Sequence, residues 1–399
     1  MRKIKLRIQK TSLYKIKNVV LLKKEISYIF RQITYKHTFV FVFIVICMNQ
    51  NSSAQYADSI RLNDIRILAS HNSYKKKPDP KVLRFLSHFK KRLGQDLDPI
   101  QLDYGHEKLP VQLDSFAIRG FEFDLAYDPE GGAYAKRRIN FFISGLKQRS
   151  KDMELSQPGL KLLHIADVDY ESNYLTFIAA LEDLKNWSRK NPDHIPLFVN
   201  LEIKRESPGD YSKFLNRMGF KKAPVTDSSI FYEIEKEILS VFNTDEVFSP
   251  KDLQMQYSSI QERLRTEGWP ELNDCLGKLI FILDGDINGF YTNAINKDEN
   301  RLMFVYSEPQ EKSCAFIIRN NPVGIEQEIK DLSNSYIVRT RTDAGTIEAR
   351  NLDYHLFESA FESNAQIIST DYYRPDYSIS DFEINLTNGK SPFVLKRKH

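Results

Sequence analysis

The feature that most constrains the fold is a series of eight short apolar runs, most of them separated by helix-like segments. Apolar runs of this length between helices are typical of parallel strands that are buried on both faces. Eight strand–helix units are the number found in a TIM barrel, so we expect an α/β fold of the (β/α)8 type. The runs are 65–70, 121–126, 161–166, 196–203, 278–284, 301–306, 335–341 and 365–370.

The rival architecture is a doubly wound open sheet. No Gly-rich phosphate loop follows the run at 65–70, which disfavours a dinucleotide-binding version of that fold. Two connections, 78–104 and 127–158, are long for a barrel, and we expect them to be insertions at its rim. Residues 55–399 are therefore predicted to form one barrel domain with insertions at its rim. The expected helices include 109–117, 174–190, 228–242, 324–333 and 347–363.

The N-terminal segment has the composition of a secretory signal. Residues 1–37 hold 11 Lys and Arg and one acidic residue, and the apolar run at 39–48 is too short to span a bilayer. Small residues at Ser52 and Ala54 favour cleavage before Gln55, so 1–54 is predicted to be a signal peptide and the protein to be secreted or held in the cell envelope. An uncleaved anchor is the alternative. A lipoprotein site at Cys47 is disfavoured because Ile46 is bulky.

The net charge of +4 belongs to this leader. The whole chain has 57 Lys and Arg against 53 Asp and Glu, and residues 55–399 alone have 46 against 52. From these totals we expect no nucleic-acid partner, because binding phosphates needs a clustered basic surface. After cleavage two cysteines remain, Cys275 and Cys314, which either pair or stay as buried thiols.

Acidic residues lie on the predicted strands, toward the rim where a barrel holds its functional groups. Glu122 and Asp124 are two residues apart, so their side chains share one face of a strand. Two carboxylates inside a barrel are costly unless a cation lies between them. With Glu202 and the amide oxygen of Asn72 they form an all-oxygen set that suits Ca²⁺ or Mg²⁺ better than Zn²⁺. The alternative is a salt-bridge network with basic residues of the barrel, Lys278, Arg339 and Arg341.

Two of the eight histidines, His71 and His164, lie at predicted strand ends on the same rim as the acids. Imidazoles titrate near neutral pH and serve as general acids and bases. We therefore interpret these two histidines as catalytic candidates.

The motifs in their order along the chain resemble those of the calcium-dependent phosphoinositide-specific phospholipases C, in particular the secreted bacterial branch. The resemblance extends from about residue 65 to residue 373. Single pieces are weak, but the ordered set is specific. The matching segments are SHNSY at 70–74, PVQLD at 110–114, RGFEFD at 119–124, His164, NLE at 200–202, GKLIFILD at 277–284 and QIISTDY at 366–372.

The resemblance implies a TIM barrel of the phospholipase C-like phosphodiesterase type and roles for individual residues. His71 matches the histidine that stabilises the pentacovalent phosphorane, and His164 matches the acid for the departing alcohol. Lys278 and Arg339 match residues near the substrate phosphate, the metal-side carboxylates or the inositol. The implied cofactor is Ca²⁺, with the ligands Asn72, Glu122, Asp124 and Glu202.

The reaction implied is metal-assisted attack of the inositol 2-hydroxyl on the phosphate of a phosphatidylinositol-type lipid. The products would be diacylglycerol and an inositol phosphate that is cyclic when first formed. We expect a monomer that contacts the membrane surface peripherally. No accessory lipid-binding domain fits in the remaining length, which favours simple phosphatidylinositol, or a soluble glycerophosphodiester, over highly phosphorylated inositides.

Two other functions stay open. A glycerophosphodiester phosphodiesterase shares the barrel, the acid pair and the metal, but it usually begins with His-Arg-Gly where this chain has His71-Asn72-Ser73. A non-catalytic cell-surface binding barrel is the second alternative. We would expect it to have lost a histidine or an acid, and none of the matching residues is lost here.

Overall fold

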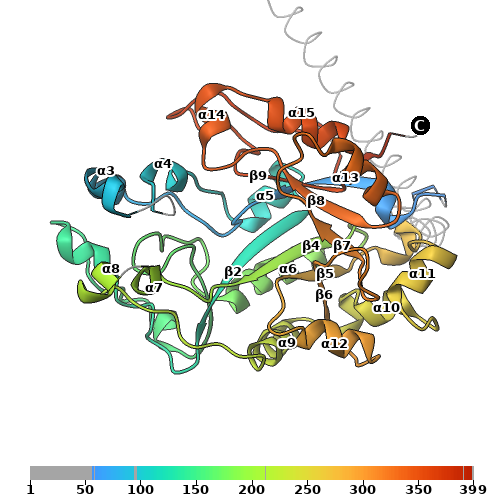
Figure 1. The fold of residues 1–399 in the computed structure, drawn as a ribbon, viewed down its shortest axis with the longest axis horizontal. Helices are drawn as coiled ribbons and strands as arrows, with labels where there is room; N and C mark the ends of the chain where they lie inside the picture. Colours follow the sequence, from blue (N-terminus) through green and yellow to red (C-terminus); the bar gives the residue numbers. More distant parts are fainter. Residues whose placement is uncertain (1–55, 58, 94–96, 212, 390, 398–399) are drawn as a thin grey trace, which may run out of the picture. The chain divides into compact units, whose positions relative to one another are not determined.

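Eight parallel strands form the centre of the structure (Figure 1). Their order is β6-β5-β4-β2-β1-β9-β8-β7, and a parallel bridge between Tyr306 and Phe316 joins the two ends into a nearly closed barrel. This confirms the predicted TIM-barrel class over an open doubly wound sheet. The strands are β1 Ile65–Ser70, β2 Gly120–Asp128, β4 Leu197–Ile203, β5 Leu279–Asp284, β6 Met303–Val305, β7 Phe316–Ile318, β8 Ile337–Arg341 and β9 Ile367–Thr370.

The computed structural model describes residues 56–397 except 58, 94–96, 212 and 390. The predicted signal peptide, 1–54, lies outside the described residues. Within the described part of the chain, no helix has the length and apolar character to cross a membrane.

One of the eight predicted barrel strands is wrong. The run at 161–166 contributes β3 (Gly159–Leu162), which pairs antiparallel with the outer end of β2 and stands outside the barrel. The missing barrel strand is β7, which no helix separates from β6, so the strand–helix alternation used for the prediction fails there. A barrel of eight strands therefore forms, but His164 lies in a loop after β3 instead of at the end of a barrel strand.

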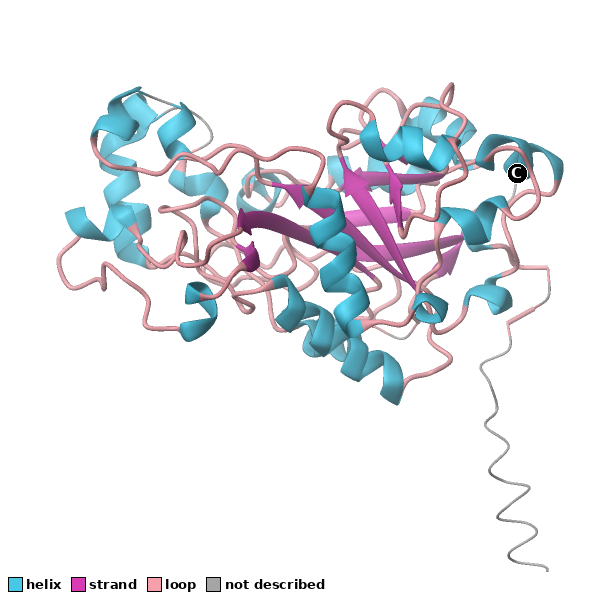
Figure 2. Cartoon of the chain, turned by 90° about the horizontal axis from the view of Figure 1, so that it is seen from below, coloured by secondary structure: helices cyan, strands magenta, loops and turns pink. Residues whose placement is uncertain are grey.

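Helices cover the outside of the barrel (Figure 2). Four predicted helices occur with shifted ends, and the predicted helix at 347–363 is two helices, broken at Leu352, whose backbone is left-handed (φ 52°). The helices after α4 (Pro99–Leu102), of which α8 belongs to the lobe described below, are α5 Leu109–Ser115, α6 Phe177–Lys190, α7 Pro208–Tyr211, α8 Lys213–Arg217, α9 Ile230–Val241, α10 Pro250–Gln254, α11 Ile260–Thr266, α12 Phe290–Asn296, α13 Glu326–Ser333, α14 Ile347–Asn351 and α15 His355–Glu362.

The barrel strands are buried on both faces, as their continuous apolar runs predict. In β5, five consecutive residues from Leu279 are buried, and they contribute to a core that also takes in Trp269 and Phe316. Cys275 and Cys314 are buried free thiols, which settles the alternative left open by the sequence. Short elements complete the described chain: the 3-10 helices η1 Leu62–Asp64, η4 Thr244–Glu246 and η5 Leu272–Cys275, and the strand β10 Val394–Leu395, which pairs with β1.

The two predicted insertions fold into a lobe beside the barrel. The first contains α3 (Pro80–Leu93) and α4 (Pro99–Leu102), and the second contains η2 (Arg138–Phe142) and η3 (Met153–Ser156). Residues 80–102, 136–151 and 213–222, which we call the rim lobe, share a separate apolar core with residues such as Val82, Ile139 and Phe220. Figure 1 shows α3 and α8 together at one end of the described unit.

Candidate functional site

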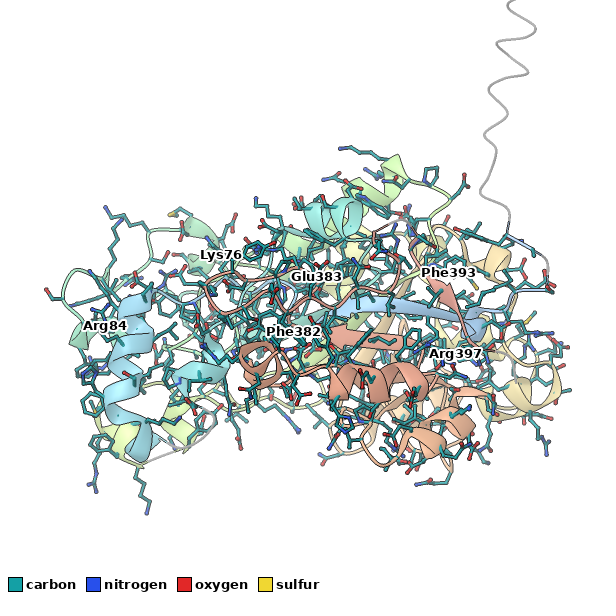
Figure 3. The ribbon with its side chains drawn as sticks, turned by 90° about the horizontal axis from the view of Figure 1, so that it is seen from above. Lys76, Arg84, Phe382, Glu383, Phe393 and Arg397 are labelled. Carbon is teal, nitrogen blue, oxygen red and sulfur yellow. The ribbon has the colours of Figure 1, made fainter. Side chains whose placement is uncertain are left out.

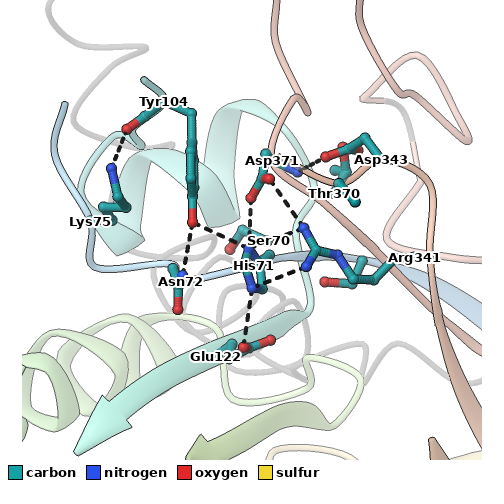
Figure 4. A network of polar contacts seen from close by, with 12 residues as sticks. Ser70, His71, Asn72, Lys75, Tyr104, Glu122, Arg341, Asp343, Thr370 and Asp371 are labelled. Carbon is teal, nitrogen blue, oxygen red and sulfur yellow. Dashed lines mark hydrogen bonds and ion pairs between the residues drawn. The ribbon is translucent and has the colours of Figure 1, made fainter. Parts of the chain in front are cut away.

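The pairing of β1 with β9 brings a histidine and an aspartate together. Ser70 lies opposite Thr370 in this parallel pair, so the following residues, His71 and Asp371, leave the barrel side by side. The Nδ1 atom of His71 lies 2.8 Å from Oδ1 of Asp371 (Figure 4). The backbone NH of Asp371 donates to Asp343 Oδ1 at 2.9 Å, which fixes the end of β9. The imidazole orientation is therefore set by residues 300 positions away.

Burial and a neighbouring cation keep His71 neutral. Burial, helped by the charge of Arg341, holds the pKa of His71 well below its usual value. Burial also raises the pKa of Asp371, to about 6, so this carboxylate is ionised at neutral pH and can accept from Nδ1–H. Arg341 donates to the other oxygen of Asp371 at 3.2 Å. Nε2 of His71 then faces Glu122, 3.5 Å from Oε1.

Asn72 adopts a left-handed backbone (φ 49°), a conformation that Asn tolerates better than most residues. Its amide nitrogen donates to Tyr104 Oη at 2.8 Å. Its amide oxygen therefore faces the two carboxylate oxygens of Asp124 at 3.1 and 3.2 Å. Oxygens this close repel unless the amide is reversed or a cation lies beside them.

Three carboxylates converge with that amide. Glu122 and Asp124 lie on β2, and Glu202 lies opposite Asp124 on β4. Oxygen atoms of all three lie within 4.8 Å of one another. Burial, reinforced by the other two acids, raises the pKa of Asp124 well above its usual value. A hard, all-oxygen set whose members repel one another fits Ca²⁺, which takes carboxylate and amide oxygens.

Basic side chains also contact these acids, as the salt-bridge alternative expected in part. Arg339 on β8 pairs with Glu122. The ammonium of Lys204, just after β4, lies 2.8 Å from Asp124 Oδ2 and 3.0 Å from Glu202 Oε1. Although burial opposes it, the two carboxylates raise the pKa of Lys204. Three carboxyl groups therefore share two cationic side chains, Arg339 and Lys204.

His164 has a carboxylate partner of its own. Its Nδ1 atom lies 2.8 Å from Asp169 Oδ2, and Asp169 in turn pairs with the buried Lys75 at 3.2 Å. Burial lowers the pKa of His164 on balance, while Asp169 opposes that shift. His164 and His71 line one pocket, whose walls also include Tyr104, Lys204, Arg341 and Asp371.

Lys278 does not join this group. It directly precedes β5, at the end of the barrel opposite the site, and lines a separate surface depression with Asp274 and Trp269. The residue of β5 on the site side is Asp284, which lies opposite Glu202 in the sheet. The predicted contact between Lys278 and substrate is therefore corrected.

The structure adds residues that sequence reasoning did not select. Lys204, Arg341 and Asp371 each end or directly follow a barrel strand, so their position at the strand ends was the available signal. Tyr104 and Asp169 come from loops, and nothing in the local sequence marked them. Of the other predicted site residues, His71 and His164 line the pocket. The metal-ligand candidates contact one another beside Lys204, another lining residue, and Arg339 pairs with one of them, Glu122.

Comparisons with known proteins agree with these motifs. Residues 60–393 match the profile of a family described as phosphoinositide phospholipase C, Ca²⁺-dependent. Among solved structures, the calcium-dependent phosphoinositol-specific phospholipase C of Pseudomonas sp. is 17% identical, with a TM-score of 0.45, over 81% of this chain and 95% of the other.

Two further solved structures are similar at the same level. The Ca²⁺-dependent phosphatidylinositol-specific phospholipase C of Streptomyces antibioticus is 14% identical, with a TM-score of 0.43, over 79% of this chain and 96% of the other. The phosphatidylinositol-specific phospholipase C of Listeria monocytogenes is 11% identical, with a TM-score of 0.44, over 82% and 94%. No curated protein matches the chain. At these identities the relatives do not assign residue roles.

Proposed function

Because this chain belongs to the Ca²⁺-dependent phosphoinositide phospholipase C family, we propose that it cleaves phosphatidylinositol-type lipids. The products are diacylglycerol and an inositol phosphate that is cyclic when first formed. The observation that carries this proposal is one pocket lined by two imidazoles, each held at Nδ1 by a carboxylate, beside a cluster of four oxygen-donating side chains.

Asn72, Glu122, Asp124 and Glu202 would hold the Ca²⁺. When bound, Ca²⁺ supplies positive charge beside the phosphate and lowers the pKa of the inositol 2-hydroxyl. Two cationic side chains of the chain itself, Lys204 and Arg341, line the same pocket and suit an anionic phosphodiester.

The two histidines take different roles in the proposal. Asp371 accepts from Nδ1–H of His71, so Nε2 of the neutral imidazole first takes the proton of the attacking hydroxyl. As Nε2–H of the resulting imidazolium, it then donates to the charged phosphorane beside Arg341. His164 protonates the oxygen of the departing diacylglycerol. Asp169 favours the protonated imidazole that this step needs. Arg339 is buried against Glu122 and Asn320, so we assign it to positioning of Glu122 and not to direct contact with inositol.

We also propose that the enzyme acts outside the cytoplasm, as a monomer that meets its substrate at a membrane surface. The basic, apolar leader at 1–54 supports the location. The lipid class that the family processes supports the contact with a membrane.

The test separates this reaction from that of a glycerophosphodiester phosphodiesterase. Phosphatidylinositol and an analogue methylated at the inositol 2-oxygen are offered in identical detergent micelles with Ca²⁺. We expect release of diacylglycerol from phosphatidylinositol only, because the nucleophile is part of that substrate. Equal cleavage of the methylated lipid, or cleavage of glycerophosphodiesters without a neighbouring hydroxyl, would replace the proposal by the phosphodiesterase reading.

A further inference from the structure

The rim lobe concentrates positive charge that the chain totals hide. It contains 15 Lys and Arg against two acidic residues, Asp96 and Asp98. The rest of residues 55–399 holds 31 Lys and Arg against 50 Asp and Glu. The totals for residues 55–399 give no sign of this surface, because three segments that are distant in sequence gather these basic residues at one end of the described unit.

Packing joins these three segments into one surface. The ring of Phe142 stacks against Phe85 of α3 and Phe220 after α8, with centroids 6.1 Å apart in each pair. Arg138 donates from Nε to the carbonyl of Met218 at 2.6 Å. Figure 3 labels Arg84 on α3 in this lobe, and Figure 2 shows the lobe as a group of helices beside the barrel. Exposed basic residues come from all three segments: Lys81, Arg84, Lys147, Arg149, Lys213 and Arg217.

Large aromatic side chains lie exposed among these charges. The exposed fractions are 38% for Phe89, 45% for Phe141, 38% for Phe142 and 52% for Phe214. The guanidinium carbon of Arg138 lies 4.8 and 5.1 Å from the ring centres of Phe141 and Phe142. Exposed aromatic rings surrounded by Lys and Arg are the pattern of a surface that enters the head-group region of a bilayer.

The lobe is continuous with the candidate active site. Leu102 and Ile165 belong to the core of the lobe and also line the pocket that contains His71 and His164. A surface that held the lobe would therefore lie next to the pocket that receives the lipid head group.

We propose that the rim lobe docks the enzyme on bilayers that carry anionic lipids. Its Lys and Arg face the phosphate groups, and its exposed Phe rings enter the interface. This deepens the proposed function, on which it rests for the lipid nature of the substrate. The charge of the lobe is complementary to an anionic bilayer and opposite to that of the rest of the molecule, so electrostatic attraction also orients the approach. A nucleic-acid duplex is the less suitable partner, because it would contact the Lys and Arg of the lobe and leave its exposed Phe rings in water.

The experiment measures co-sedimentation with vesicles that contain no phosphatidylinositol. We expect the protein to bind vesicles of phosphatidylcholine with phosphatidylglycerol, to bind pure phosphatidylcholine weakly, and to dissociate as salt is raised. The double variant Arg84→Glu with Lys147→Glu is expected to lose binding by about tenfold or more. Phe141→Ser with Phe214→Ser is expected to weaken binding at all salt concentrations. The matched control, Lys236→Glu with Lys297→Glu, makes the same charge change on α9 and after α12 and is expected to bind like wild type.

Other outcomes overturn the proposal. These are wild-type indifference to phosphatidylglycerol, an equal loss in the control variant, and binding to duplex DNA that vesicles do not displace. Thermal melting confirms that each variant is folded, with Phe141→Ser alone as the milder change. Hydrolysis of dispersed short-chain phosphatidylinositol is expected to be unchanged in the lobe variants. Failure of the proposed function would appear with the dispersed short-chain substrate. Failure of the docking proposal would appear with the vesicles that contain no phosphatidylinositol.

Discussion

His71 and Asp371, 300 residues apart, meet at 2.8 Å because β1 and β9 pair in register up to the residues before them. The carboxylate of Asp371 holds one edge of the imidazole. Arg341 donates to that carboxylate, and Asp343 accepts from the backbone NH of Asp371. The barrel closure between the first and last strands thus sets the orientation of a catalytic candidate. Geometry at this histidine depends on tertiary structure and not on local sequence.

Removing the charge of Asp371 tests that relationship. We expect Asp371→Asn to lower kcat on the order of 100-fold, because the amide no longer selects the proton position at Nδ1. KM and the melting temperature should change little. Steady-state kinetics across pH measure the effect. A variant with wild-type kcat and an unchanged pH profile would show that Asp371 does not position His71.

The acid role of His164 predicts a dependence on the leaving group. His164→Ala should lose on the order of 10²–10⁴-fold in kcat for phosphatidylinositol. With a nitrophenyl ester of inositol phosphate the loss should be much smaller, because nitrophenolate leaves without a proton. His71→Ala should be impaired on both substrates, which provides the matched comparison. Equal losses for the two substrates in His164→Ala would remove the acid assignment.

Lys204 competes with the cation for Asp124 and Glu202. Lys204→Met should therefore bind Ca²⁺ more tightly, by at least about tenfold, because the ion no longer displaces an ammonium from these carboxylates. Without the ion the same variant should melt lower, since the acids lose a counter-charge. Titration calorimetry and thermal melting measure both effects, and Lys204→Arg is the charge-preserving control. Weaker Ca²⁺ binding by Lys204→Met would contradict the assigned contacts.

Glu237 on α9 predicts a pH dependence of stability outside the site. Burial raises its pKa to about 7, although the NH of Leu160 donates to it at 2.8 Å. The folded state therefore holds the proton more tightly than the unfolded state. The contribution of this protonated carboxyl to the free energy of unfolding is fully present below about pH 4.5 and is lost as pH rises toward 7. Glu237→Gln should gain roughly 2–3 kcal/mol over wild type across that interval. Chemical denaturation at a series of pH values measures the free energy of unfolding of both proteins. A constant difference between them across this pH range would contradict the raised pKa of Glu237.

The sequence predicted the barrel because apolar periodicity is a local property of each strand. Seven of the eight runs lie in the barrel. β7 was missed because no helix separates it from β6, so the strand–helix alternation fails there. β3 was misplaced because an apolar run does not reveal whether its partner is parallel or antiparallel. The broken helix at Leu352 depends on a left-handed residue that composition does not mark.

The acids and His71 were predictable because parallel strands present their carboxyl ends together. His164 was selected on a wrong strand assignment, since it follows the antiparallel β3. The contacts that these residues make with side chains from other strands were not predictable from the sequence. Lys278 was assigned to the substrate through the resemblance alone, although it directly precedes β5 and therefore lies at the end of the barrel opposite the site. Lys204 takes the place at the carboxylates. The basic lobe escaped prediction for a related reason, since its charges gather only when three insertions pack together.

The most direct test of the central claim is phosphorus NMR of phosphatidylinositol treated with the protein. With Ca²⁺, we predict that the lipid phosphodiester signal is replaced by the signal of a cyclic inositol phosphate, with or without its later hydrolysis. With the ion chelated, the lipid signal should persist, and Mg²⁺ should restore turnover poorly. An unchanged lipid in the presence of Ca²⁺, or the same products after chelation, would contradict the account.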